Sequence, residues 1–224
     1  MKRIFRTAVF MLGLTFLNGG LEKAAAETFD TKNKMIQKDV EIKLPETVKM
    51  GKYLQNGAEP EPVQWKVLGK ENGKVLLLAE NGLEALPFNK ERKTVSWKES
   101  SIRQWLNEDF YDSAFSEAEK NSILGNEDKV FLLSTDEVEK YLSSLENRLC
   151  KPTALARKHG AYTNGEGCSA WWLRSSSGKY AQMDYLSSAG NFGSRTHYVD
   201  ENILAVRPAI WVEDAFFKNL LKDR

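Results

Sequence analysis

The sequence predicts an α+β domain in which short helices pack on twisted antiparallel sheets and a β-hairpin lies late in the chain. Three observations lead to this prediction. An Asn-Gly turn joins two apolar runs near residue 72, three Ser-x-x-Glu motifs mark helix starts between residues 96 and 137, and strand-like patterns follow from residue 169. Strands and capped helices mixed in this way are typical of the α+β class.

The first two strands carry the clearest hairpin signal. Apolar and polar residues alternate over residues 63–67, residues 71–73 (ENG) make a turn, and residues 75–79 (VLLLA) are all apolar. Asn-Gly favours a type I′ turn because both central residues of that turn need a positive φ. The second strand is apolar on both faces, which predicts a central position in its sheet.

Three helices are predicted to begin with a capping box, in which a Ser accepts a hydrogen bond from the N3 amide and a Glu reaches back to the N-cap amide. The pairs are Ser96 with Glu99, Ser116 with Glu119, and Ser134 with Glu137. After the first box, four apolar residues at helical spacing predict a buried face: Ile102, Trp105, Leu106 and Phe110. A fourth helical turn is predicted up to residue 158, with Pro at its start and Gly after its end.

The last third of the domain is predicted to be strands. Residues 169–175 (SAWWLRS) alternate between two faces, and residues 180–186 and 191–199 form a hairpin around residues 187–190 (SSAG). The final strand covers residues 204–212, and Pro208 within it predicts an edge position or a bulge. Arg174 and Arg207 are predicted to be structural, each paired with a carboxylate or an aromatic face.

The first 26 residues predict a secretory signal peptide. Residues 1–6 are positively charged, residues 7–17 are mostly apolar, and residues 24–26 (AAA) supply a small-residue cleavage site. The apolar run is shorter than the roughly 20 residues that span a bilayer, so a membrane anchor is a weaker interpretation. A buried helix is also weaker, because of the charge arrangement and the small-residue site. We expect an exported protein, periplasmic or extracellular, with an N-terminal extension at 27–47, a domain at 48–213 and a C-terminal helix at 214–224.

The charge balance excludes several classes of partner. The chain has 32 basic and 31 acidic residues, and cleavage after Ala26 leaves 28 basic and 30 acidic residues. Proteins that bind nucleic acid or membrane surfaces by charge carry a basic excess instead. The mature domain is therefore not expected to bind nucleic acid or to insert into a membrane.

The two cysteines, Cys150 and Cys168, are interpreted in the light of export. An oxidising compartment permits a disulfide, which would stabilise the fold by about 3 kcal/mol, and two inert thiols are the other structural possibility. A Cys nucleophile served by His159 or His197 is the functional alternative, although neither Cys lies in a recognisable nucleophile motif. The spacing of the Cys and His residues does not fit a zinc site, so no metal is predicted.

Seven short motifs follow one another along the chain: residues 63–68 (VQWKVL), 74–79 (KVLLLA), 97–107 (WKESSIRQWLN), 114–116 (AFS), 130–134 (VFLLS), 171–175 (WWLRS) and 206–210 (VRPAI). Together they resemble a bacterial family known as domain of unknown function six-two-seven-three, over about residues 48–211. Cys150 and Cys168 also fall where members of that family often have Cys, and we expect them to be paired.

The family is similar to the C-type lectin fold, in the version shared by formylglycine-generating enzymes and the variable proteins of diversity-generating retroelements. Two departures limit what this resemblance implies. Calcium-dependent lectins use a Glu-Pro-Asn or Gln-Pro-Asp tripeptide with a Trp-Asn-Asp, whereas this chain has residues 59–62 (EPEP) in another region and no Trp-Asn-Asp. Formylglycine-generating enzymes need a reactive Cys pair later in the fold. Neither a calcium-bridged sugar site nor oxidase activity is therefore expected, and no cofactor is predicted.

The remaining candidate surface lies between the last two long strand motifs, over residues 175–202. In the retroelement variable proteins, the corresponding stretch displays the ligand-binding residues. Its side chains suit recognition by stacking and hydrogen bonding. The residues expected to bind a ligand are Tyr180, Asp184, Tyr185, Asn191, Arg195, His197 and Tyr198; the plainer interpretation of each is the solvated face of a hairpin.

The preferred function is that of an exported, non-enzymatic binding domain that recognises a protein or glycan of the cell envelope or of a host surface. The alternative is an exported enzyme, either similar to formylglycine-generating enzymes or dependent on a thiol, which would use Cys168 or Cys150 with His197. A structural envelope protein without a small ligand is the third possibility.

Overall fold

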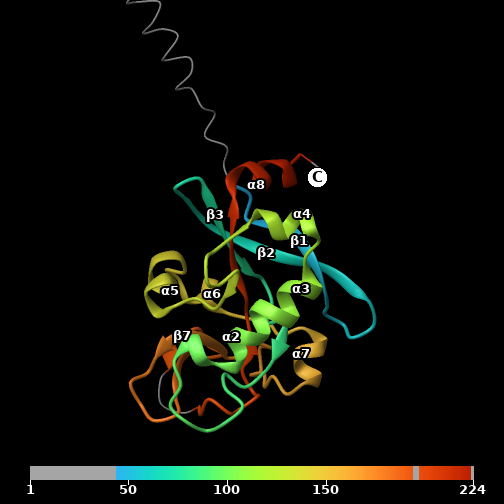
Figure 1. Cartoon of the computed structure of the whole chain (residues 1–224). Coiled ribbons are helices and arrows are strands. Elements are labelled where there is room, and N and C mark those ends of the chain that lie inside the picture. The colour runs from blue at the N-terminus through green and yellow to red at the C-terminus, as the bar shows by residue number, and fades with distance from the viewer. Residues whose placement is uncertain (1–43, 194–196, 223–224) are drawn as a thin grey trace, which may run out of the picture. The chain divides into compact units, whose positions relative to one another are not determined.

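The computed structural model describes residues 44–193 and 197–222 (Figure 1). The elements below belong to the compact unit that begins at Pro45. The predicted signal peptide and Arg195 lie outside the described residues.

Two β-sheets form the framework of this unit. In the first, the order is β1-β2-β3-β11-β5, with β6 also paired to β11, and every pair is antiparallel. Its strands are β1 (Thr47–Leu54), β2 (Pro60–Glu71), β3 (Lys74–Ala79), β5 (Ile123–Leu124), β6 (Val130–Phe131) and β11 (Ala209–Glu213). The second sheet has the order β4-β10-β7-β8-β9, antiparallel except between β7 and β10. Its strands are β4 (Glu84–Ala85), β7 (Trp171–Ser176), β8 (Met183–Leu186), β9 (Phe192–Gly193) and β10 (Ala205–Val206).

Short helices connect the strands, so the predicted α+β class is confirmed. The α-helices are α2 (Ser101–Trp105), α3 (Tyr111–Ala114), α4 (Glu117–Ser122), α5 (Thr135–Tyr141), α6 (Leu145–Arg148), α7 (Ala154–Lys158) and α8 (Asp214–Leu220). A 3-10 turn, η1 (Trp97–Glu99), precedes α2, and a π-helical turn, η2 (Leu106–Phe110), joins α2 to α3.

The two predicted hairpins are confirmed. In the turn between β2 and β3, Asn72 has a φ of 48° and Gly73 a φ of 74°, as a type I′ turn requires. β3 lies between β2 and β11, and its side chains are buried from Val75 onward. The later hairpin pairs β8 with β9 around residues 187–190.

Two of the three capping boxes are confirmed, those of Ser116 with Glu119 and Ser134 with Glu137. The box at Ser96 was a wrong prediction. Residues 97–99 form a separate 3-10 turn, and the hydroxyl of Ser96 donates to the Glu99 carboxylate at 2.8 Å rather than capping an amide. The helix begins later, where the side chain of Ser100 accepts from the Arg103 amide.

The buried face after this cap is confirmed except at Trp105. Ile102, Leu106 and Phe110 are buried, whereas Trp105 is half-buried. In an α-helix, side chains four residues apart differ in direction by about 40° around the helix axis. The π turn has more residues per turn, so it returns Phe110 to the side of the helix on which Ile102 lies. Trp105 is about 60° away from Ile102 around the helix and therefore lies at the edge of the buried face.

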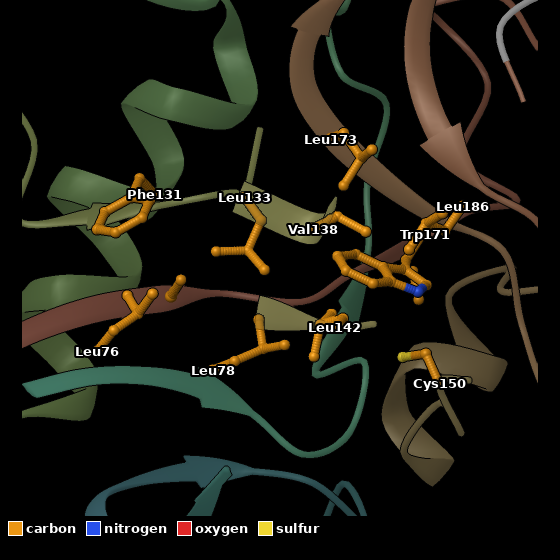
Figure 2. Close-up of a cluster of buried hydrophobic side chains, with 12 residues drawn as sticks. Leu76, Leu78, Phe131, Leu133, Val138, Leu142, Cys150, Trp171, Leu173 and Leu186 are labelled. Carbon is orange, nitrogen blue, oxygen red and sulfur yellow. The ribbon is translucent and has the colours of Figure 1, made fainter. Parts of the chain in front are cut away.

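The main core lies between the two sheets (Figure 2). Leu76 and Leu78 of β3 belong to the same buried cluster as Trp171 of β7 and Leu186 of β8, together with side chains from β6 and α5. Burying one such aliphatic or aromatic side chain contributes about 1.5–3 kcal/mol. The cluster therefore joins the sheets into a single hydrophobic core.

Trp171 and Trp172 point to opposite faces of β7, and both are fully buried. Each indole N–H donates to a backbone carbonyl, that of Arg148 at 2.9 Å and that of Leu86 at 3.1 Å. Beyond them, Arg174 forms a two-pronged ion pair with Glu137 at 2.6 and 2.7 Å, as predicted. The second sheet is thus covered on both faces.

The last strand differs from its prediction. Pro208 was expected to mark an edge position or a bulge, but the chain changes sheet there: β10 belongs to the second sheet, and β11 lies inside the first, between β3 and β5. Because Pro has no N–H, the ladder is interrupted where the chain crosses. Arg207 at this crossing is fully buried, donates to the Ala79 carbonyl at 2.8 Å and lies 5.0 Å from the Trp171 ring. Its predicted aromatic partner is confirmed.

Candidate functional site

A pocket opens beside the late hairpin, and we call it the hairpin pocket. Its volume is about 240 Å³. Its walls come from the loop after α7, from β8 and the turn after it, and from the segment that leads into β10. The lining residues are Tyr162, Ala170, Tyr185, Ser187, Ser188, His197, Ile203 and Leu204.

Two predicted ligand-binding residues, Tyr185 and His197, meet in this pocket. Their ring centroids are 4.8 Å apart and the rings are inclined by 72°, an edge-to-face contact. The Nδ1 atom of His197 lies 2.8 Å from the Glu201 carboxylate, which also accepts from the Tyr198 amide at 3.1 Å. Since a carboxylate only accepts, this contact places the proton on Nδ1 and leaves Nε2 as the acceptor of the neutral imidazole.

The mouth of the pocket is apolar and exposed. Tyr162 is 71% exposed and Ile203 39%, although both line the pocket. The Tyr162 amide donates to the Ile203 carbonyl at 3.0 Å, so backbone pairing holds the two walls together. Large exposed apolar side chains at the edge of a pocket commonly mark an interaction site.

Two other predicted residues, Tyr180 and Tyr198, gather around Arg92 instead. The Tyr180 hydroxyl donates to the Arg92 carbonyl at 3.2 Å, and the Arg92 guanidinium lies 4.3 Å from the Tyr198 ring. Arg92 also pairs with Asp200 at 2.9 Å. These tyrosines therefore flank the hairpin on a neighbouring surface and do not line the pocket.

The remaining predicted residues do not line the pocket either. Asp184 accepts from the Thr135 hydroxyl at 3.1 Å and thereby ties β8 to the start of α5. Asn191 closes the hairpin turn, because its amide donates to the Ser187 hydroxyl at 3.1 Å and its carbonyl accepts from the Ser187 amide at 2.8 Å. Both have structural roles in the hairpin and its support.

Sequence reasoning missed Tyr162 and Ile203. Tyr162 stands in a loop with three glycines, at 160, 165 and 167, and Ile203 follows three polar residues. An isolated large apolar residue in a polar loop is the signal that could have identified each one. The pairing that joins them spans 41 residues of chain and leaves no local pattern.

A family model with the description "Domain of unknown function (DUF6273)" matches residues 72–214, more than half of the chain. The chain belongs to this family. The match begins in the turn between β2 and β3 rather than near residue 48, and every lining residue of the hairpin pocket lies within it. No curated protein and no solved structure matches the chain.

The two cysteines of this DUF6273 domain do not form the expected disulfide in the structure. Cys150 and Cys168 are both free and buried. Cys150 lies in the core cluster with Trp171 (Figure 2), and burial raises the pKa of its thiol. A buried neutral thiol behaves as a small apolar side chain, so the structural alternative of two inert thiols describes these positions.

A second group of ionisable residues, outside the hairpin pocket, surrounds Glu84. This buried carboxylate contacts His159 Nδ1 at 2.5 Å, the Ala85 amide at 2.9 Å and the Tyr53 hydroxyl at 3.2 Å. Burial and the nearby charge of Glu84 raise the pKa of Tyr53 well above its ordinary value, so the phenol stays neutral and keeps donating. The group ties β1, β4 and α7 together and satisfies the buried carboxylate.

Over residues 44–193 and 197–222, no group of three or more His, Cys, Asp or Glu side chains could hold a metal ion. No helix in the same ranges is long and apolar enough to cross a membrane.

Proposed function

We propose that this DUF6273 domain is a non-enzymatic binding domain that recognises a protein or glycan ligand through the hairpin pocket. The observation that carries the proposal is the pocket of about 240 Å³ with exposed apolar side chains at its mouth and His197 at its wall. An apolar pocket with a few placed polar groups is the usual form of a ligand site. A sugar ring would stack on Tyr162 and donate a hydroxyl hydrogen bond to His197, whereas an apolar side chain of a protein would pack on Tyr162 alone.

The geometry gives less support to a thiol-dependent enzyme. Both thiols are buried, and among the described residues no hydrogen bond joins either thiol to a histidine. The reactive form of cysteine is the exposed or stabilised thiolate, which burial disfavours. The binding function is therefore preferred to the enzymatic alternative.

The C-type lectin-like fold remains part of the proposal. The arrangement of two sheets with short helices, and a late hairpin followed by an Arg-containing strand, supports it. An experimental structure of a family member would test it by superposition on formylglycine-generating enzymes, and a different order of strands would overturn it. Because one fold serves many functions, the ligand proposal does not depend on this assignment.

The site is tested with two pocket variants and one control variant of the mature chain. We expect Tyr162→Ala and Ile203→Ala to weaken ligand binding at least about tenfold, which corresponds to about 1.4 kcal/mol. The control is Leu54→Ala, because Leu54 is 38% exposed, nearly equal to Ile203, but lies on β1 of the first sheet. A ligand is first sought on a glycan array and in pull-downs from cell envelopes, and the purified ligand is then titrated calorimetrically.

The outcomes separate the possibilities. Loss of binding in both pocket variants, with binding retained in Leu54→Ala, supports the site. Equal binding by wild type and both pocket variants contradicts it, provided that thermal unfolding shows all chains folded. A ligand retained from the array identifies a glycan, and one retained only from the protein pull-down identifies a protein.

Export of the protein is proposed from the N-terminal 26 residues. We expect mass spectrometry of the protein from the producing cell to give a mature N-terminus at Glu27, outside the cytoplasm, because residues 24–26 are small and precede it. A chain that retains Met1 or Lys2 and stays in the cytoplasmic fraction would contradict export.

A further inference from the structure

A second pocket lies between residues 86–90 and the helical segment 101–109. Its volume is about 180 Å³, and the side chains that matter here are Lys90, Gln104, Trp105, Glu108 and Asp109. The segment after β4 forms one wall, and α2 with the π turn η2 forms the other. This Trp105 pocket shares no lining residue with the hairpin pocket.

The π turn explains why these side chains face the pocket. It keeps Ile102, Leu106 and Phe110 in the core. Of the residues between them, Trp105 is half-buried, and Glu108 and Asp109 are exposed. π turns inside helices occur frequently at functional sites. Here the irregular turn places an aromatic ring and two carboxylates around one hollow.

Trp105 differs from four of the other five tryptophans of the domain. The indole N–H groups of Trp65, Trp97, Trp171 and Trp172 all donate to protein oxygens. Within the described part of the chain, the indole N–H of Trp105 has no hydrogen-bond partner, and the side chain is only half-buried.

The ring of Trp105 is nevertheless held in place. Tyr53 contacts it edge-on with centroids 6.4 Å apart, and Phe110 packs against it at 5.5 Å. A rigid aromatic ring with an unused donor at a pocket wall loses little entropy when a ligand stacks on it.

The charges around the pocket indicate what kind of ligand would fit. Glu108 accepts from the Gln104 amide at 3.0 Å, whereas Asp109 and Lys90 form no side-chain hydrogen bond or ion pair with any described residue. The two carboxylates would repel an anionic ligand. The Lys90 ammonium would repel a cationic ligand. A neutral ring with hydroxyl groups can donate to Asp109 and accept from Lys90 and from the indole N–H.

We propose that the Trp105 pocket binds a neutral polyhydroxylated ring, a pyranose sugar, which stacks on Trp105 and hydrogen-bonds to Asp109 and Lys90. The proposal is independent of the function proposed for the hairpin pocket, because the two sites share no residue and can be altered separately.

The test uses the mature chain, with the methyl glycosides of glucose, galactose, mannose and N-acetylglucosamine as probes. Binding of each glycoside is measured by saturation-transfer NMR and by tryptophan fluorescence. At least one glycoside should bind with a Kd of about 10 mM or lower. We expect Trp105→Leu and Asp109→Asn each to weaken this binding about tenfold. Asp109 is exposed, so its substitution is compatible with folding even if Trp105→Leu lowers stability.

Matched controls stand elsewhere in the domain. Trp211→Leu removes another half-buried indole, one that Lys74 covers at 4.3 Å, and Asp136→Asn neutralises another exposed carboxylate. Both should leave glycoside binding within about twofold of wild type.

Three results would overturn the proposal: no saturable signal from any glycoside up to about 10 mM, unchanged binding in Asp109→Asn, or loss of glycoside binding in Tyr162→Ala alone. Binding of choline in preference to every glycoside would also overturn it, because a cation would then be the ligand of Trp105.

Discussion

Arg207→Ala should lower the free energy of unfolding by about 3–5 kcal/mol. The guanidinium is fully buried where the chain passes from one sheet to the other, donates to the carbonyls of Ala79 and Leu149, and covers the Trp171 ring. Alanine would leave a cavity in the core and two carbonyls without this donor. Urea unfolding followed by tryptophan fluorescence measures the loss.

Arg207→Met is the matched control, because it retains most of the side-chain volume but removes the charge. Burial lowers the pKa of Arg207, and one of its terminal nitrogens has no partner within the described residues, so the charge itself costs stability. Arg207→Met should therefore lower the free energy of unfolding by less than half as much as Arg207→Ala. Equal losses in both variants would show that the hydrogen bonds, and not the packing, hold the crossing together.

Gly51→Ala should also destabilise the domain strongly, by about 2–4 kcal/mol. Gly51 has a φ of +67° at a bulge in β1, and a Cβ atom there would lie 2.8 Å from the Ala114 carbonyl oxygen and 2.9 Å from the Phe115 ring. Its amide donates to Glu119 at 2.7 Å, so the backbone cannot move away without losing that bond. The same unfolding measurement applies.

Gly73→Ala separates backbone strain from the clash. Gly73 has a similar φ of +74°, but a Cβ atom there would meet nothing within 4 Å. We expect a loss of about 1–2 kcal/mol from the left-handed conformation alone. If Gly51→Ala and Gly73→Ala proved equally stable, close packing against α3 would not explain why residue 51 is a glycine.

Local patterns predicted the local parts of the fold. The Asn72-Gly73 turn and the boxes at Ser116 and Ser134 depend on residues within a few positions of each other, and each was found as expected. The error at Ser96 shows the limit of such patterns, because Ser100 offers a competing N-cap only four residues later. Pro208 was misjudged because a break in strand pairing is compatible with an edge and also with a change of sheet.

The candidate site was predicted only in part. Tyr185 and His197 lie in one stretch of chain that is rich in polar and aromatic residues, and they do meet in a pocket. Tyr162 reaches the same pocket through backbone pairing with Ile203, which depends on the tertiary fold. Asp184 has the right composition for a site but is used to support α5, and sequence alone does not distinguish these roles.

The change of sheet between β10 and β11 also has a consequence for synthesis of the chain. β10 lies between β4 and β7, and β11 lies between β3 and β5, so residues 205–213 supply an inner strand to both sheets. Neither sheet can close until these residues have left the ribosome. A chain truncated before residue 205 would expose the unpaired edges of β3 and β7, which are templates for aggregation. The edges of β7 and β3 that pair with β10 and β11 are therefore covered only when residues 205–213 join the fold.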